Sequence, residues 1–153
     1  MPIKTIFVLL AMWNVSVGLW AADDPFIGTW KLNLAKSQSI PGPLLKSTTM
    51  KIEPHGSGVM VTRDGEDSAG HWEFTANLDG KHYPVTNDPT RDTVALKRID
   101  AYTWEGTNKK AGKANSSSVR WVVSKDGKTL TLKWKGMNAQ GQPTNNVRIY
   151  DKQ

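Results

Sequence analysis

The chain has 153 residues, no cysteine, a formal net charge of +6, 38% hydrophobic residues and 22% charged residues. This length indicates one domain, and the absence of thiols excludes disulfides, thiolate zinc sites, iron–sulfur clusters and cysteine nucleophiles. The 13 glycines and 8 prolines predict many turns, which favours short strands joined by tight loops over a helical bundle.

The N-terminal residues have the pattern of a secretory signal peptide. One positive charge precedes a mostly apolar stretch over residues 5–20, and Ala21 and Ala22 are small enough for cleavage. A transmembrane helix is the alternative, but the stretch is shorter than about 20 residues and contains polar side chains. We therefore expect a signal over residues 1–21, no transmembrane segment in the mature form, and a domain over residues 22–153 that is secreted or periplasmic.

From residue 28 onward, apolar and polar residues alternate in short segments. In the first of them, Gly28, Trp30, Leu32 and Leu34 fall on one side and the polar residues on the other. Such a period of two predicts strands that are buried on one face. We expect about ten strands, at residues 28–34, 49–53, 58–63, 72–76, 81–86, 93–99, 102–106, 119–123, 129–135 and 147–150.

Short turn signals separate these strands, which favours antiparallel pairing between neighbours. Asp79-Gly80 and Asp126-Gly127 are two of them. A single sheet of this length would curl, so the sequence predicts an all-β fold, an antiparallel up-and-down β-barrel of eight to ten strands. The proline-rich segment over residues 35–46 is expected to be a lid or a crossover loop rather than a long helix.

Both ends of the expected barrel resemble a known superfamily. Phe26–Leu32 contains Gly-x-Trp and resembles the opening strand of the calycins, which include lipocalins and fatty-acid-binding proteins. Val147–Lys152 resembles the closing strand of intracellular fatty-acid-binding proteins. The two segments bracket the chain at the separation that this superfamily requires. The chain thus resembles a lipocalin-like calycin, of the kind that bacteria export.

This resemblance implies a barrel that holds a small hydrophobic or amphipathic ligand, such as a fatty acid, and performs no chemistry. Fatty-acid-binding proteins hold the ligand carboxylate with an Arg-x-Tyr pair on the last strand and an arginine two strands earlier. Arg148 and Tyr150 match the pair, and Arg120 is the best match for the second arginine. Guanidinium and phenol groups suit this role because they form charge-assisted hydrogen bonds to a carboxylate.

The alternation of the last strands leaves two placements open for these three residues. If the apolar positions Val119, Trp121, Val147 and Ile149 face inward, then Arg120, Arg148 and Tyr150 face outward. A cavity with a polar lining would reverse that assignment for the strands concerned.

The resemblance to lipocalins implies a second role for Arg148. In lipocalins a basic residue of the last strand packs across the signature tryptophan, so Gly28, Trp30 and Arg148 are expected to close one end of the barrel. Contact with the ligand and a solvated side chain are the other two interpretations of Arg148. Trp72 and Trp104 are interpreted either as barrel core or as aromatic walls that contact the ligand.

Other functional classes have weaker support in the sequence. It contains no Gly-x-Ser-x-Gly, His-Glu-x-x-His or phosphate-binding loop, so we expect neither an enzyme nor a bound metal or cofactor. A haem-binding or catalytic calycin, with His71 or His82 as the haem ligand, is the alternative. A structural or interaction barrel with a filled interior is a third possibility. Lys133-Trp134-Lys135 combines charge with an aromatic ring, but export argues against a nucleic-acid partner.

Overall fold

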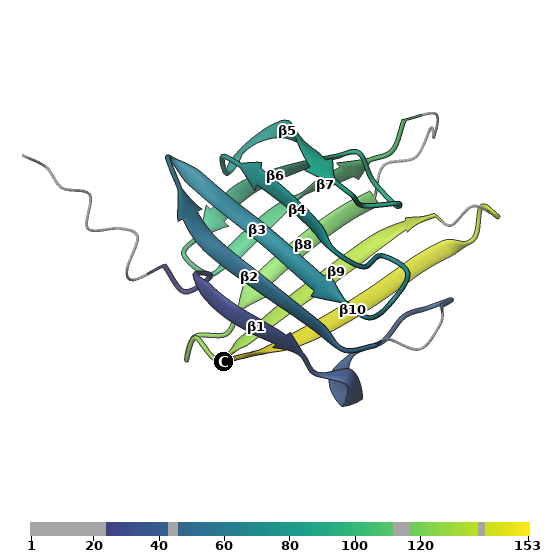
Figure 1. Cartoon of the computed structure of the whole chain (residues 1–153), viewed down its shortest axis with the longest axis horizontal. Helices are drawn as coiled ribbons and strands as arrows, with labels where there is room; N and C mark the ends of the chain where they lie inside the picture. The colour runs from purple at the N-terminus through teal and green to yellow at the C-terminus, as the bar shows by residue number, and fades with distance from the viewer. Residues whose placement is uncertain (1–23, 43–45, 112–116, 138–139) are drawn as a thin grey trace, which may run out of the picture.

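Ten antiparallel strands among the described residues form one closed barrel in the computed structural model (Figure 1). The structure describes residues 24–42, 46–111, 117–137 and 140–153, so the expected signal peptide lies outside the described residues. A short 3-10 helix, η1 (Leu34–Lys36), follows the first strand. The strands are β1 (Gly28–Leu32), β2 (Thr48–His55), β3 (Gly58–Gly65), β4 (Trp72–Ala76), β5 (Asp79–Thr86), β6 (Thr93–Asp100), β7 (Thr103–Lys109), β8 (Ser117–Val123), β9 (Thr129–Met137) and β10 (Pro143–Lys152).

Each strand pairs with the next one in the chain, and β10 returns to pair with β1. This order confirms the expected all-β, up-and-down barrel and fixes its strand number at ten. Alternation is the physical cause of the closure. On β2, for example, Met50 and Ile52 are buried while Lys51 between them is exposed. A closed barrel hides such a face on every strand and leaves no free sheet edge.

The first strand is shorter than the alternation predicts. It ends at Leu32 because the side chain of Asn33 accepts a hydrogen bond from the backbone N–H of Lys36 (3.2 Å), which caps η1. The chain then runs beside β10, where Gln38 pairs with Val147. The described part of the expected lid or crossover loop is therefore a crossover, and it continues along β10 beyond the residues that pair with β1.

Aromatic rings close the end of the barrel at which the described chain begins. The ring of Phe26 stacks on Trp104 with 3.9 Å between centroids, and Trp104 lies next to Trp121 at 5.7 Å. The indole N–H of Trp30 donates a hydrogen bond to the carbonyl oxygen of Phe26 (2.9 Å). All four side chains are fully buried, and we call them the aromatic floor.

The cation over Trp30 is Lys152, which corrects the expectation that Arg148 closes the barrel there. The Nζ atom of Lys152 lies 5.0 Å from the centre of the Trp30 ring. Strand register decides this, because Trp30 is the direct partner of Lys152 on β10. Arg148 lies four residues earlier, with its guanidinium 5.3 Å from the ring of Trp134.

Candidate binding site in the barrel interior

The inner face of β10 is polar, and it carries Arg148 and Tyr150. These residues pair directly with Leu132 and Leu130 of β9, both of which are buried. Because directly opposite residues project to the same side of a sheet, Arg148 and Tyr150 face the interior. Tyr150 is 2% exposed. The sequence left open whether Arg148 and Tyr150 face outward or line a polar cavity. On β10 the structure places both residues toward the interior.

Arg63 enters the same interior from β3 and is almost fully buried. Its guanidinium donates to the carbonyl oxygen of Gly70 (2.8 Å), to Thr48 Oγ1 (3.2 Å) and to the Asp67 carboxylate (2.5 Å). Gly65 leaves the space for this group, since a Cβ at that position would lie 2.6 Å from a guanidinium nitrogen of Arg63. Arg63 is thus held rigidly beside the β3–β4 turn.

Arg91 is, like Arg63, almost fully buried, and the loop between β5 and β6 supplies it. Its Nε lies 2.9 Å from the carboxylate of Asp88, and it donates a hydrogen bond to Asn108 Oδ1 (3.1 Å). The guanidinium also stacks over Trp72, with 4.3 Å from its carbon to the ring centroid. Burial lowers the pKa of Arg91, and the charge of Asp88 opposes that change. Neither Arg63 nor Arg91 was among the residues that the sequence pattern predicts for the site.

The charges inside the barrel do not balance. Three arginines face two carboxylates, Asp67 and Asp88, and Arg148 has no ion pair with any carboxylate in the described part of the chain. The Nε atoms of Arg148 and Arg63 are buried and lack a hydrogen-bond partner among the described residues. Burying a polar group without a partner costs free energy. The arrangement therefore favours an anion beside Arg148.

Two titratable groups in this region have shifted pKa values. Burial raises the pKa of Tyr150, and the charges of Arg148 and Arg63 oppose this rise. The phenol is therefore neutral at pH 7, so it can donate a hydrogen bond. Partial burial acts to raise the pKa of Asp67, but the hydrogen bond and charge of Arg63 outweigh it, and the pKa is lowered. Asp67 is therefore ionised at neutral pH and acts as the counter-charge of Arg63.

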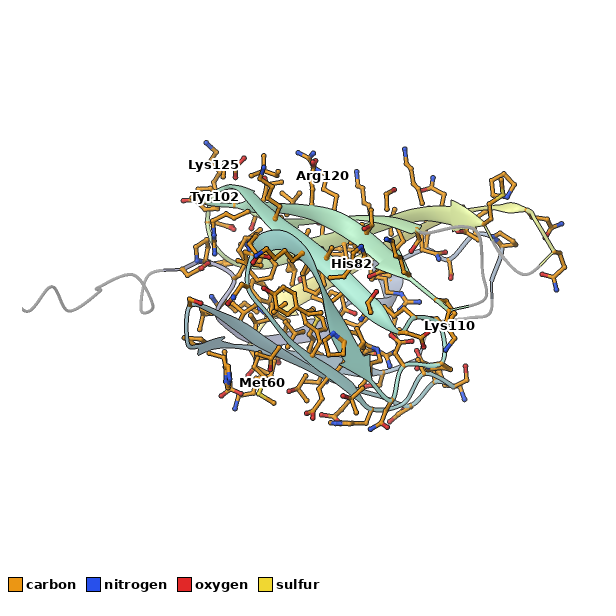
Figure 2. The ribbon with its side chains drawn as sticks, turned by 90° about the horizontal axis from the view of Figure 1, so that it is seen from above. Met60, His82, Tyr102, Lys110, Arg120 and Lys125 are labelled. Carbon is orange, nitrogen blue, oxygen red and sulfur yellow. The ribbon has the colours of Figure 1, made fainter. Side chains whose placement is uncertain are left out.

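The remaining predicted ligand residues do not all lie beside Arg148. Arg120 points away from the barrel (Figure 2), its side chain is 53% exposed, and it forms an ion pair with Glu105 on the outside. This placement corrects the expectation that Arg120 faces the ligand, because its strand presents Val119 and Trp121 to the core instead. Trp72 lies under Arg91, whereas Trp104 belongs to the aromatic floor.

The two histidines considered for haem have polar partners at the surface. The Nδ1 atom of His71 lies 2.6 Å from the Asp64 carboxylate, and Nδ1 of His82 lies 3.0 Å from Thr93 Oγ1. Both histidines are exposed. Within residues 24–42, 46–111, 117–137 and 140–153, no group of three or more metal-ligating side chains could hold an ion. The same residues contain no helix long and apolar enough to cross a membrane.

Comparison with solved structures finds the same architecture elsewhere. The chain superposes on a zebrafish ileal bile acid-binding protein in complex with cholic acid, with a TM-score of 0.56 and 14% sequence identity. The match covers 84% of this chain and 99% of that protein. The fold is of the calycin type. No protein-family model matches the sequence, and no curated protein matches it.

Proposed function

We propose that this protein binds a small amphipathic molecule with an acidic head group inside its barrel and does not transform it. The observation that carries the proposal is the inward-facing Arg148, which has a buried Nε without a partner and no ion pair among the described residues. A carboxylate would neutralise the excess positive charge there. The zebrafish protein of the same fold holds cholic acid, which is a carboxylic acid on an apolar body, and this supports the proposal.

The roles of the polar residues follow from their contacts. Arg148 supplies the main charge, because Arg63 and Arg91 are already paired with Asp67 and Asp88. Tyr150 lies two residues from Arg148 on the same face, so its hydroxyl is placed to donate to the same carboxylate. A charge-assisted hydrogen bond of this kind contributes about 1.5–3 kcal/mol, which is roughly a 10- to 150-fold gain in affinity.

Titration calorimetry with dodecanoate and with cholate tests this proposal. We expect Arg148→Met to weaken binding of either acid at least tenfold, since the variant keeps an unbranched apolar stem but loses the guanidinium and its charge. Arg120→Met is the matched control, because it removes an arginine from the outside of the same barrel. Dodecanol, which lacks the carboxylate, should bind the wild type and Arg148→Met equally.

Two results would overturn the proposal: equal loss of affinity in both arginine variants, or no saturable binding of either acid by wild type. Thermal unfolding of each variant separates lost affinity from lost folding. If Arg148→Met lowered stability while affinity stayed unchanged, Arg148 would be a packing residue over Trp134 rather than a ligand contact.

The proposed setting is that of an exported carrier, secreted or periplasmic, of the lipocalin-like kind. The residue pattern over 1–21 supports export, as described above. N-terminal sequencing of the protein from a secreting host tests this directly. We expect a mature chain that starts at Ala22 or Asp23. Retention of Met1 in a cytosolic fraction would contradict export without affecting the binding proposal.

A further inference from the structure

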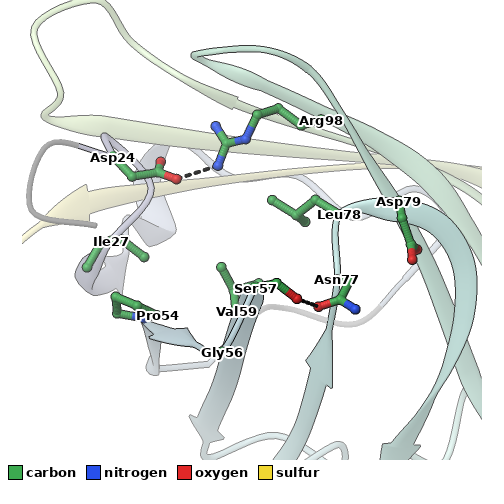
Figure 3. A pocket seen from close by; sticks show the side chains of 11 residues that line it. Asp24, Ile27, Pro54, Gly56, Ser57, Val59, Asn77, Leu78, Asp79 and Arg98 are labelled. Atoms are coloured by element: carbon green, nitrogen blue, oxygen red, sulfur yellow. Dashed lines mark hydrogen bonds and ion pairs between the residues drawn. The ribbon is translucent and has the colours of Figure 1, made fainter. Parts of the chain in front are cut away.

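We propose that a pocket at the floor end of the barrel is a second ligand site, for a small molecule that joins an apolar body to a protonated amine. The pocket has a volume of about 630 Å³ (Figure 3). Strand β3 runs from this pocket at Gly58 and Val59 to Arg63 at the other site. None of the five ligand-binding residues expected from the sequence lines it. The two sites are therefore separate.

The pocket exists because β4 and β5 diverge. Among the described residues these strands pair only at Glu73 with Thr86 and at Phe74 with Val85. Beyond that point the chain passes through Asn77 and Leu78, both of which line the pocket. The β2–β3 turn lies beside this segment (Figure 3), and Ser57 Oγ donates a hydrogen bond to Asn77 Oδ1 (2.9 Å).

Gly58 allows the β2–β3 turn to approach the end of β4 closely. A Cβ at Gly58 would lie 2.1 Å from the carbonyl oxygen of Ala76, so no other residue fits there without moving the backbone of β4. The β2–β3 turn and the end of β4 are thus held together by a close backbone approach and by the bond between Ser57 and Asn77. Such a preformed site binds a small ligand without the cost of ordering its walls.

Apolar side chains form the inner surface of this pocket. Val59 is buried, while Ile27 and Leu78 are partly buried and pack against the core. Pro54 adds an apolar ring at the rim. These groups suit the apolar body of a ligand, because their contact with it removes hydrocarbon surface from water.

The charged groups that line the pocket leave one carboxylate without an ion pair. Arg98 is engaged, since its guanidinium forms an ion pair with Asp24 and lies over the rings of Phe26 and Trp104, 5.8 and 5.6 Å from their centroids. Asp79 is the second carboxylate, and it has no ion pair with any described residue. The lining therefore carries one net negative charge in a chain whose formal charge is +6.

Asp79 remains ionised at neutral pH. The backbone N–H of Lys81 donates to its carboxylate (2.9 Å), and the hydroxyl of Tyr83 donates to the other oxygen (2.9 Å). These hydrogen bonds lower the pKa of Asp79, with the Lys81 bond as the largest cause. A carboxylate held in this way can receive an ammonium group from a ligand whose body lies on Leu78.

The test compares two probes with the same aromatic body and opposite charge, 1-naphthylmethylamine and 1-naphthylacetate, by NMR titration of the full chain. We expect saturable binding of the amine, with shifts at the amides of Ser57, Asn77 and Leu78. The acid should bind this pocket roughly two- to fivefold more weakly, which is the range for one exposed ion pair.

Two variants complete the experiment. Asp79→Asn should remove the preference for the amine, whereas Asp126→Asn should keep it. Asp126 is a matched control because it also accepts a backbone N–H two residues on, from Lys128 (3.0 Å), but it lies outside the pocket. Leu78→Trp should block both probes while its thermal unfolding stays cooperative, which shows that the barrel still folds.

The inference fails if the amine does not saturate, if its shifts map only near Arg148, or if Asp79→Asn and Asp126→Asn behave alike. It does not depend on the proposed function. Loss of dodecanoate binding in Arg148→Met, with naphthylmethylamine binding intact, would establish the two sites as separate.

Discussion

Lys152 covers the ring of Trp30 at the seam between the first and last strands, with Nζ 5.0 Å from the ring centre. Gly28 makes this contact possible, because a Cβ at that position would lie 2.8 Å from Cε of Lys152. The lysine also donates a hydrogen bond to the carbonyl oxygen of Pro25 (3.3 Å). The end of the chain thereby fastens the segment that leads into β1.

Lys152→Ala should lower the free energy of unfolding by about 0.5–1 kcal/mol, the value of an exposed cation–π contact. Lys125→Ala, at an exposed lysine in the β8–β9 turn, is the control and should stay within about 0.5 kcal/mol of wild type. Urea unfolding followed by tryptophan fluorescence measures both. Equal stabilities of the two variants would show that the contact with Trp30 does not stabilise the seam.

The Arg63–Asp67 pair predicts a loss of stability in acid. Because the pKa of Asp67 is lower in the folded chain, its contribution is fully present above the unfolded pKa of about 4 and is lost as pH falls through the folded value. Asp67→Asn should destabilise by about 1–3 kcal/mol at pH 7, since it removes a charged hydrogen bond from a buried arginine.

The stability difference between wild type and Asp67→Asn should shrink as the pH is lowered from 5 to 2, because protonation of Asp67 then removes the ion pair with Arg63 from wild type as well. Urea unfolding across this range measures it. Glu66→Gln, at the exposed neighbouring acid, is the control for a change of net charge in the same turn. A deficit of Asp67→Asn that stays constant down to pH 2 would mean that the ion pair does not act through ionisation of Asp67.

Most strands could be predicted because their inner faces are apolar and their outer faces polar. The sequence 129–135 is an example, since Leu130, Leu132 and Trp134 alternate with polar residues and face inward. The same rule was wrong for β10. Its inner positions are Arg148 and Tyr150, while Val147 and Ile149 lie outside, so hydrophobicity alone assigns the two faces the wrong way round.

The polar interior depends on contacts between distant segments, which the sequence pattern does not contain. Arg63 continues the inward series of Val59 and Val61, and this signal could have identified it. Arg91 gave no such signal, because it lies in a loop and becomes buried only when Asn108 and Trp72 approach it. Register likewise decides that Lys152, and not Arg148, meets Trp30.

A further prediction concerns the glycine in the middle of β7. A Cβ at Gly106 would lie 1.6 Å from the carbonyl oxygen of Ala95 on β6, so Gly106→Ala must push the two strands apart. We expect a loss of more than about 3 kcal/mol or failure to fold, judged by thermal unfolding and circular dichroism. Gly127→Ala is the control, since a Cβ there meets no atom within 4 Å.

Gly127 has a φ of +71°, so its substitution still costs backbone strain, of order 1 kcal/mol. Gly106 is not among the glycines with a positive φ, so Gly106→Ala is the less stable variant only if its clash with β6 costs more than this strain. If Gly106→Ala were as stable as Gly127→Ala, the close approach of β6 and β7 would not exist in solution.

The ion pair of Asp88 with Arg91 predicts non-additive effects on stability. Both side chains are almost fully buried, at 4% and 5% exposure. Asp88→Asn should therefore cost about 3–5 kcal/mol, because it leaves a buried guanidinium without its counter-charge. Asparagine can still accept the backbone N–H of Thr90, so the turn itself is preserved.

Arg91→Met in the Asp88→Asn background should recover much of this loss. The thioether keeps an apolar contact with Trp72, and no uncompensated charge remains in the interior. A double-mutant cycle measured by urea unfolding gives the coupling energy. Glu105→Gln, which breaks the exposed pair with Arg120, should cost less than about 1 kcal/mol. Equal costs for Asp88→Asn and Glu105→Gln would show that water reaches Arg91 in the folded barrel.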